Sequence, residues 1–392
     1  MNSSFRLSSR FADVKSSPVR DILAVVGRSE IISFAGGIPD ADLFEAADFA
    51  SAFDQVLTHQ AKRALQYATT QGEPELRELL AARLNRHLAT RSDQIQVTSG
   101  SQEGLFLVGM ALIDPGDVVL VEQPTYLAAV QAFGLAGARL VPVPSDECGV
   151  VPEALAAAIA EHAPKFVYLV PNFQNPTGRT MPALRREQVA EILLRTGTPL
   201  LEDDPYGALR FDGEPVAPIA SLPGMAAQSV LQNSASKIMA PGVRIGWLRA
   251  EGDLLRALEI GKQAVGLQSA VTDQLAVAHY LANCDLDAHI ARVVAAYRVR
   301  RDAMVDGLRA LLPVGAEVNR PEGGMFLWVR LGGAVDTADV LPRALDAGVA
   351  YVPGWPFYAA DPDRSTMRLS YVTNTPDVIA TGLDRMARAF GW

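Results

Sequence analysis

The middle of the chain alternates short apolar runs with segments of helical length. The apolar runs between residues 117 and 234 are DVVLVEQ, ARLVPVP, KFVYLVP, TPLLEDD and SVLQNS. The intervening segments include TYLAAVQAFGLA and MPALRREQVAEILLR, which have the length and mixed polarity of surface helices. Strands that alternate with helices indicate βαβ units, which build a largely parallel sheet with helices on both faces. We therefore predict an α/β fold.

The pattern changes near residue 285. A long helical run, DLDAHIARVVAAYRVRRDAMVDGLRALL, is followed by two strand-like segments, GMFLWVRL and TMRLSYV. This change without a linker predicts a smaller α+β domain joined to the larger one by a continuous helix. We expect an N-terminal arm and part of the small domain in 1–44, a large domain in 45–285, and the rest of the small domain in 286–392.

Composition narrows the possible partners. The 392 residues carry a net charge of -9, so the long-range field repels nucleic acid and anionic membranes. No apolar run approaches the length that spans a bilayer, and the N-terminal arm lacks the apolar core of a secretory signal. Two cysteines, Cys148 and Cys284, give no disulfide framework. We predict a cytoplasmic protein; a transit peptide is the alternative for the Arg- and Ser-rich arm.

Ligands of open α/β sheets bind at the carboxyl ends of the strands, where two polar turns stand out. In VTSGSQEGL, a glycine-containing turn leads into a helix near Ser101, and such a turn suits a phosphate. The alternative is that Ser101 only caps its helix. In PNFQNPTG, Asn175 follows a strand, and the alternative there is that its side chain caps its own turn.

Two further places carry charge. Glu202, Asp203 and Asp204 end an apolar strand, and alternation turns at least one of them inward, where it needs a cationic or protonated partner. Tyr206 follows closely; the alternative is a set of solvated loop acids. The stretch NSASKIMAPGVRIGW places Lys237 after two serines, Ser234 and Ser236, and seven residues before Arg244.

These four places together meet the needs of one ligand. An acid keeps a pyridine nitrogen protonated, and neutral donors hold a ring hydroxyl. Hydroxyls, N–H groups and an arginine bind a phosphate, and a lysine binds an aldehyde. The ligand with all four groups is pyridoxal 5'-phosphate (PLP).

The chain resembles the fold-type I, class I/II aminotransferases that depend on PLP, in the branch of the 2-aminoadipate and kynurenine aminotransferases and the aminotransferase-like domain of MocR regulators. The motifs that carry this resemblance are SFAGGIPDADLF, LQYATTQGEPELRELLA, TSGSQEGL, EQPTYLAA, PNFQNPTG, LEDDPY, SASKIMAPGVRIGW, PEGGMFLWVR, VPGWPFY and MRLSYV. It implies a mostly parallel seven-stranded sheet in the large domain and a smaller α+β domain.

The resemblance also implies roles for residues around the cofactor ring. Lys237 would hold PLP as a Schiff base, and Asp203 would pair with the pyridinium nitrogen. Asn175 and Tyr206 would bond the ring O3′, and Tyr126 would stack on the ring face.

Other roles concern the phosphate and the substrate. The implied phosphate ligands are Ser101, Gln102, Ser234, Ser236, Arg244 and, from the other subunit of a homodimer, Tyr67. Tyr67 could instead be a packed aromatic residue at the start of a helix. Arg368 would clamp the substrate α-carboxylate, helped by Asn175 and the backbone near Gly37. Arg20 is a candidate contact for an acidic or polar substrate side chain, with a surface position as the alternative.

The implied reaction transfers an amino group from an L-amino acid to a 2-oxo acid. Lys237 moves the Cα proton, and a pKa lowered by neighbouring positive charge suits that task. Glu103 beside the phosphate turn, and Trp355 with Pro356, depart from the family pattern and leave room for another PLP-dependent Cα chemistry, such as that of a decarboxylase, lyase or oxidase. A PLP-binding sensor domain is a further alternative, which the acidic composition and the absence of a winged-helix segment disfavour.

Overall fold

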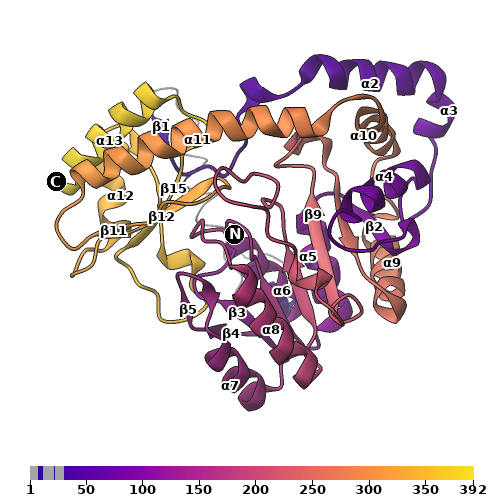
Figure 1. The fold of residues 1–392 in the computed structure, drawn as a ribbon, viewed down its shortest axis with the longest axis horizontal. Coiled ribbons are helices and arrows are strands. Elements are labelled where there is room, and N and C mark those ends of the chain that lie inside the picture. Colours follow the sequence, from indigo (N-terminus) through magenta and orange to yellow (C-terminus); the bar gives the residue numbers. More distant parts are fainter. Residues whose placement is uncertain (1–7, 12–21, 23–30) are drawn as a thin grey trace, which may run out of the picture.

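A seven-stranded sheet forms the centre of the larger unit (Figure 1). The computed structural model describes residues 8–11, 22 and 31–392. In sheet order the strands are β2 (Ile95–Thr98), β10 (Gly246–Arg249), β9 (Ser229–Ser234), β8 (Leu200–Asp203), β7 (Phe166–Leu169), β3 (Val118–Glu122) and β4 (Arg139–Val143). Only β10 runs antiparallel to its neighbours within this sheet. The predicted α/β fold with a mostly parallel sheet is confirmed.

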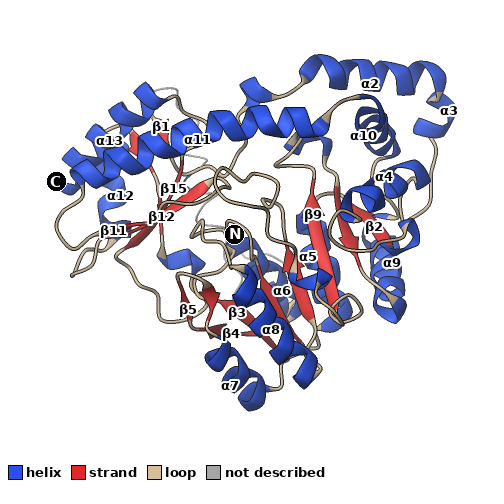
Figure 2. Ribbon diagram, in the orientation of Figure 1, coloured by secondary structure: helices blue, strands red, loops and turns tan. Residues whose placement is uncertain are grey.

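The strands of this sheet other than β4 are buried at nearly every position because helices cover both faces (Figure 2). The helices around it are α5 (Ser101–Leu112), α6 (Leu127–Ala136), α7 (Pro152–His162) and α8 (Ala183–Thr196). Successive residues of β3 divide between two cores. Val119 and Val121 belong to the core that contains Phe133 of α6, whereas Val118 and Leu120 belong to the core that contains Val189 of α8.

The C-terminal part forms a second, antiparallel sheet. Its order is β11 (Glu317–Val318), β12 (Phe326–Arg330), β15 (Thr366–Ser370) and β14 (Val352–Pro353). The long helix α11 (Leu286–Leu311) runs from the larger unit to this sheet and packs on α13 (Pro376–Phe390) (Figure 1). Near the start of the chain, β1 (Ile32–Ser33) pairs in parallel with β13 (Val349–Ala350). An early segment therefore lies in the unit built from the end of the chain.

The remaining elements connect or flank these sheets. They are α2 (Ala46–His59), α3 (Ala61–Ala64), α4 (Pro74–Leu84), α9 (Gly252–Gly266), α10 (Val271–Asn283), α12 (Thr337–Asp346), β5 (Ser145–Asp146), β6 (Gly149–Val150) and the 3₁₀ helices Ser9–Phe11, Ala41–Leu43, Ser92–Gln94, Ile219–Ser221, Pro241–Val243 and Trp355–Phe357. Within the described ranges, no helix is both long and apolar enough to cross a bilayer.

One glycine marks a close approach of the two units. Gly178, in the loop after β7, has a φ of +69°, and a Cβ there would lie 2.3 Å from the backbone oxygen of Phe326 in β12. No side chain fits between these two backbones. The loop that carries Asn175 is thus held against the second sheet by direct backbone contact.

We expect Gly178→Ala to destabilise the protein more than a matched substitution elsewhere. Gly197, at the end of α8, has a similar φ of +68°, but a Cβ there would have no heavy atom within 4 Å. Gly197→Ala should cost about 1 kcal/mol through left-handed strain alone. Gly178→Ala adds a steric clash of about 1–3 kcal/mol. Denaturant unfolding of both variants measures the difference, and equal losses would contradict the contact.

Candidate active site

A cavity of about 310 Å³ lies where the carboxyl ends of β7, β8 and β9 face β12 and β15. Its lining is Gly37, Ile38, Ser101, Gln102, Tyr126, Val170, Asn175, Asp203, Pro205, Tyr206, Ser234, Ser236, Lys237, Pro241, Arg244, Phe326 and Arg368. Of the predicted site residues that the structure describes, only Tyr67 is not part of this lining. Segments up to 331 residues apart in the chain therefore meet at one place, as Gly37 and Arg368 show.

Lys237 lies in the turn between β9 and β10, and its amine is buried in the cavity. The Nζ atom donates a hydrogen bond to the Gly37 carbonyl oxygen at 2.9 Å. Burial, and then the positive charges of Arg368 and Arg244, lower the pKa of Lys237 from 10.5 to about 8. A neutral amine, which is the nucleophilic and basic form, is therefore accessible near physiological pH.

Asp203 is the last residue of β8 and is only 3 % exposed. Its Oδ2 accepts a hydrogen bond from the Tyr168 hydroxyl at 2.9 Å. Its Oδ1 is also buried but has no hydrogen-bond partner among the described residues. Burial raises the pKa of Asp203 to about 6, although Gln232 and Tyr168 oppose the shift. A buried acceptor of this kind suits a positively charged N–H donor.

The two acids beside Asp203 have other partners. Glu202 accepts hydrogen bonds from the backbone N–H groups of Ile219 and Ala220 at 3.0 and 2.8 Å. The side chain of Asp204 accepts from the Asn172 amide at 2.9 Å. Burial raises the pKa of both acids, and the charge of the buried Arg186 opposes the shift. Because the three acids are buried or held in this way, the alternative of solvated loop acids is wrong. Asp203 is the one of the three that lines the cavity.

The turn of Ser99 and Gly100 before α5, together with Arg244, forms a site suited to an anion, which we call the cradle. Gly100 precedes the helix with a φ of 92°, and no side chain caps the first turn, so the alternative that Ser101 acts as the cap is wrong. Because Gly100 has no side chain, Arg244 can approach closely; a Cβ on Gly100 would lie 2.4 Å from its Nη2 atom. That Nη2 atom donates a hydrogen bond to the Ser99 carbonyl oxygen at 2.9 Å. The helix N-terminus and the guanidinium, with the Ser234 hydroxyl beside them in the cavity, suit a phosphate.

Arg368 lies opposite this cradle, on β15, with 3 % of its surface exposed. Its Nη1 donates to the Asn175 Oδ1 atom and its Nη2 to the Ala35 oxygen, both at 2.8 Å. The guanidinium lies 4.2 Å from the ring centre of Phe326. Burial lowers the pKa of Arg368 to about 10, which leaves it charged at neutral pH. A fixed, desolvated guanidinium is suited to binding a carboxylate.

Asn175 joins this arginine to Tyr206. Its Nδ2 donates to the Tyr206 hydroxyl oxygen at 3.4 Å, while its Oδ1 accepts from Arg368. The alternative that Asn175 only caps its own turn is therefore wrong. Burial raises the pKa of Tyr206, so its hydroxyl remains protonated and can act as a hydrogen-bond donor.

One predicted residue in the described part of the chain lies apart from the cavity. Tyr67, in the loop between α3 and α4, is 77 % exposed, so the alternative of a packed core aromatic is wrong within one chain. Arg20 lies outside the described residues. Trp355 and Pro356 begin the 3₁₀ helix Trp355–Phe357 and do not belong to the cavity lining. The departure at those two positions leaves the cavity wall unchanged.

Sequence reasoning missed Tyr168 and Arg186, which influence the pKa values of the three acids at the end of β8. Tyr168 is the one polar residue within the buried run FVYL of β7, and a buried hydroxyl needs a partner. Arg186 is an arginine in the first two turns of α8 that is only 1 % exposed. The signal for Tyr168 was present in its strand, whereas the burial of Arg186 depends on tertiary packing.

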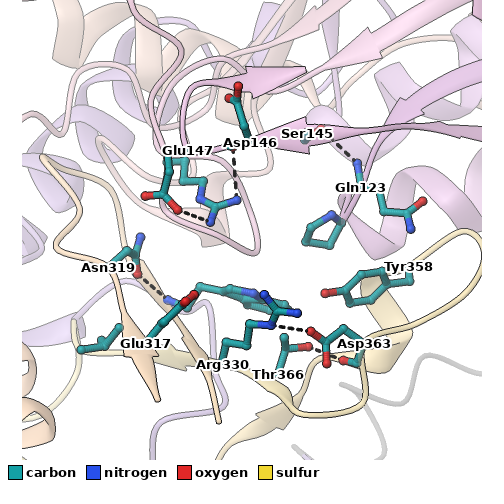
Figure 3. A pocket seen from close by; sticks show the side chains of 14 residues that line it. Gln123, Ser145, Asp146, Glu147, Glu317, Asn319, Arg330, Tyr358, Asp363 and Thr366 are labelled. Atoms are coloured by element: carbon teal, nitrogen blue, oxygen red, sulfur yellow. Dashed lines mark hydrogen bonds and ion pairs between the residues drawn. The ribbon is translucent and has the colours of Figure 1, made fainter. Parts of the chain in front are cut away.

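A larger cavity of about 560 Å³ lies between the β5–β6 hairpin and β12 (Figure 3). Its polar groups largely satisfy one another. Arg330 pairs with Asp363 at 2.8 Å, and Arg179 pairs with Glu147 at 3.0 Å. No lysine is among the described residues of its lining, whereas the smaller cavity brings together a lysine, a buried acid with an unpartnered oxygen and two arginines.

The family described as aminotransferase class I and II matches residues 29–386. The chain belongs to this family. It is 38 % identical over 387 residues to aromatic-amino-acid aminotransferase 1 of Thermococcus litoralis, covering 97 % of this chain and 93 % of that one. Its fold confirms the family's fold-type I architecture.

Two solved structures are similar throughout. The alpha-aminoadipate aminotransferase of Thermus thermophilus, complexed with N-(5'-phosphopyridoxyl)-L-leucine, has a TM-score of 0.92 and 34 % identity, covering 98 % of this chain and 97 % of that one. The kynurenine aminotransferase of Pyrococcus horikoshii, in complex with PMP, has a TM-score of 0.93 and 38 % identity, covering 98 % and 96 %. The protein is a PLP-dependent aminotransferase that acts on an amino acid and a 2-oxo acid.

The residues of the cavity fit PLP. The unpartnered Asp203 Oδ1 can accept from a protonated ring nitrogen, the glycine-lined turn before α5 leaves room for a phosphate, and Lys237 supplies a buried amine. When bound, PLP supplies an electron-withdrawing ring that stabilises negative charge at the substrate Cα.

We expect covalent capture of PLP by the apoprotein to accelerate as the pH rises through about 8. The lowered pKa of Lys237 means that its amine loses its proton, and becomes nucleophilic, near this pH. Borohydride trapping at timed intervals, followed by peptide mass mapping, measures the label on Lys237. The exposed Lys62 serves as the internal control. A rate that keeps rising through pH 10 would show an ordinary lysine.

Proposed function

We propose that Lys237 is the residue that binds PLP covalently and moves the substrate proton in this aminotransferase. The observation that carries the proposal is the position of its amine, which is buried in a cavity that also holds an acid without a cation and an anion cradle. With PLP bound, Nζ would be the group that takes the proton from the substrate Cα and holds it for return. Its lowered pKa suits both steps.

The neighbouring side chains hold the reacting groups in place. Asp203 keeps the ring nitrogen protonated, because a buried carboxylate without a cation strongly favours a positive partner. Tyr206 and Asn175 would donate to O3′, Tyr126 would cover the ring face, and Arg368 with the backbone at Gly37 would orient the substrate carboxylate. The residues of this chain that would bind the phosphate all line the cavity: Ser101, Gln102, Ser234, Ser236 and Arg244.

We infer that the preferred amino donor has an apolar or aromatic side chain. Ile38 is 53 % exposed at the cavity, and Tyr126 is an aromatic residue of its lining. Among the described residues, the cations of the lining are Lys237, Arg244 and Arg368, and each already has a task proposed above. Relatives named for aromatic amino acids and kynurenine support the same class. An acidic donor, which Arg20 would favour, is the competing hypothesis.

A panel of amino acids mixed with the purified PLP-loaded protein and a 2-oxo acid tests this assignment. We expect phenylalanine, tyrosine and kynurenine to yield their 2-oxo acids, and glutamate and 2-aminoadipate to react more slowly as donors. Chromatography of the released 2-oxo acids measures both rates. Release of CO₂ or ammonia in place of transfer would contradict the reaction type.

Two variants of neighbouring acids sharpen the same assay. Asp203→Asn should reduce transfer at least about a hundredfold with PLP still bound, because the amide cannot keep the ring nitrogen protonated. Asp204→Asn is the matched control, since an amide oxygen can still accept from Asn172 and Gly207. The reverse ranking would overturn the role of Asp203.

We propose a homodimer in which Tyr67 completes the phosphate site of the partner subunit. Exposed apolar side chains gather near Tyr67 in this chain. Leu65 is 76 % exposed and Leu267 is 53 % exposed, and the Ala68 N–H donates to Gln268 at 2.6 Å, so the two loops lie side by side. Such a patch favours contact with another protein surface. A second copy of this chain would cover it and bring Tyr67 to a cradle.

Coexpression of two inactive variants tests the shared site. Tyr67→Asp removes the proposed phosphate contact and adds repulsion, and Lys237→Ala removes the amine. If sites are shared, a hybrid dimer has one intact site, with Lys237 from one chain and Tyr67 from the other. We expect doubly tagged hybrids to recover activity toward half that of the wild type. A hybrid as inactive as its parents would place Tyr67 outside the site.

We also propose the domain limits 1–44, 45–285 and 286–392, and a cytoplasmic location. The β1–β13 pair supports assigning the early residues to the smaller unit, and α11 begins at Leu286. The unpaired Cys148 and Cys284 are compatible with a reducing compartment.

A further inference from the structure

A buried ion pair lies beside the cradle, outside the cavity lining. Lys262, on α9, is fully buried, and its Nζ donates to Oε2 of Glu103 at 2.8 Å. Glu103 belongs to the first turn of α5, the helix whose N-terminus forms the cradle. The helices α5 and α9 pack against each other. Glu103, the residue that departs from the family pattern, is thus paired with a buried cation, Lys262.

This pair is connected to the cradle through Ser99. The Ser99 N–H donates to Glu103 Oε2 at 2.5 Å, and the Ser99 carbonyl oxygen accepts from Arg244 Nη2 at 2.9 Å. Lys262 also donates to the Ser269 hydroxyl at 2.9 Å, which lies 3.1 Å from the Ser99 hydroxyl. Both backbone polar groups and the side chain of Ser99 are therefore fixed, one residue before Gly100.

The charges explain why the two residues act as a pair. A carboxylate in the first turn of α5 benefits from the helix dipole but would repel a phosphate at the same helix end. Lys262 neutralises that charge at close range. Burying both ions is costly, and removing one would leave the other uncompensated. A neutral pair that kept the acceptor for Ser99 would do the same positioning without either charge.

We propose that Glu103 and Lys262 are positioning residues for the phosphate of PLP. Glu103 holds the Ser99 N–H and Lys262 holds and neutralises Glu103, so that the turn presents its N–H groups and Arg244 in one fixed arrangement. This inference rests on the proposed phosphate site. It concerns binding of the phosphate group and leaves the ring contacts unaffected.

Two double variants of the full-length protein separate positioning from charge. Both Glu103→Gln/Lys262→Met and Glu103→Leu/Lys262→Met remove the two charges, so neither leaves a buried ion unpaired. Only the first keeps an acceptor for the Ser99 N–H. Equilibrium titration of each apoprotein with PLP and with pyridoxal, which lacks the phosphate, gives two dissociation constants per variant.

We expect the Gln/Met variant to bind PLP within about threefold of the wild type. The Leu/Met variant should bind PLP at least about tenfold more weakly, with pyridoxal binding changed less than about threefold. The ³¹P NMR shift of bound PLP should move in the Leu/Met variant alone. Equal losses for PLP and pyridoxal, or equal PLP binding by the two double variants, would overturn the inference.

Two further variants keep this result distinct from the proposed function. Arg301→Met removes another fully buried cation, which pairs with the partly exposed Asp212 away from the cavity, and should lower stability without changing the PLP-to-pyridoxal affinity ratio. Arg244→Met removes a proposed phosphate ligand and should lower that ratio. If Arg244→Met leaves the ratio unchanged, the phosphate site itself is wrong. If it lowers the ratio and the Leu/Met variant does not, only the role of Glu103 and Lys262 fails.

Discussion

The rest of the site depends on one carboxylate buried without a cation. Burial raises the pKa of Asp203 from 3.8 to about 6, so the apoprotein bears an energetic penalty that is absent below pH 3.8 and complete above pH 6. Two pKa units correspond to about 3 kcal/mol. A protonated pyridine nitrogen at the unpartnered Oδ1 would remove this penalty. The fold thereby favours a positively charged ring over any neutral occupant.

Of the three neighbouring acids, Asp203 is the one that needs a positively charged ligand, because groups of the protein stabilise the ionised forms of the other two. Arg186 lies close enough to Glu202 and Asp204 to favour their ionised forms, and backbone N–H groups bond both carboxylates. Tyr168 gives Asp203 one neutral hydrogen bond and no charge. Glu202 and Asp203 have different environments because successive side chains of a strand point to opposite faces of a sheet that is covered on both sides. Asp204 follows the end of the strand and bonds Asn172 and Gly207.

Local pattern predicted most strands of the sheet and several residues of the cavity, whereas Gln102, Tyr126 and Arg368 came from the family resemblance alone. The apolar runs predicted β3, β4, β7, β8 and β9, and the residues just after the strands predicted Asn175, Asp203 and Lys237. Pattern could not show which acid lacks a cation, because the position of Arg186 depends on how α8 packs on the sheet. The family resemblance marked Glu103 only as a departure from the family pattern. Its partner Lys262 is 159 residues away, and nothing local to either residue indicates the pair.

The link between Arg368 and Ala35 has a consequence for the order in which the protein is made. The guanidinium donates to a carbonyl oxygen 333 residues earlier, and β1 pairs with a strand that begins at Val349. During synthesis Ala35 therefore leaves the ribosome long before Arg368 does. A nascent chain that ends before β15 already contains Lys237 and the turn before α5, but it lacks Arg368, the proposed contact for the substrate carboxylate. Arg368 is thus the last of the described cavity residues to be synthesised.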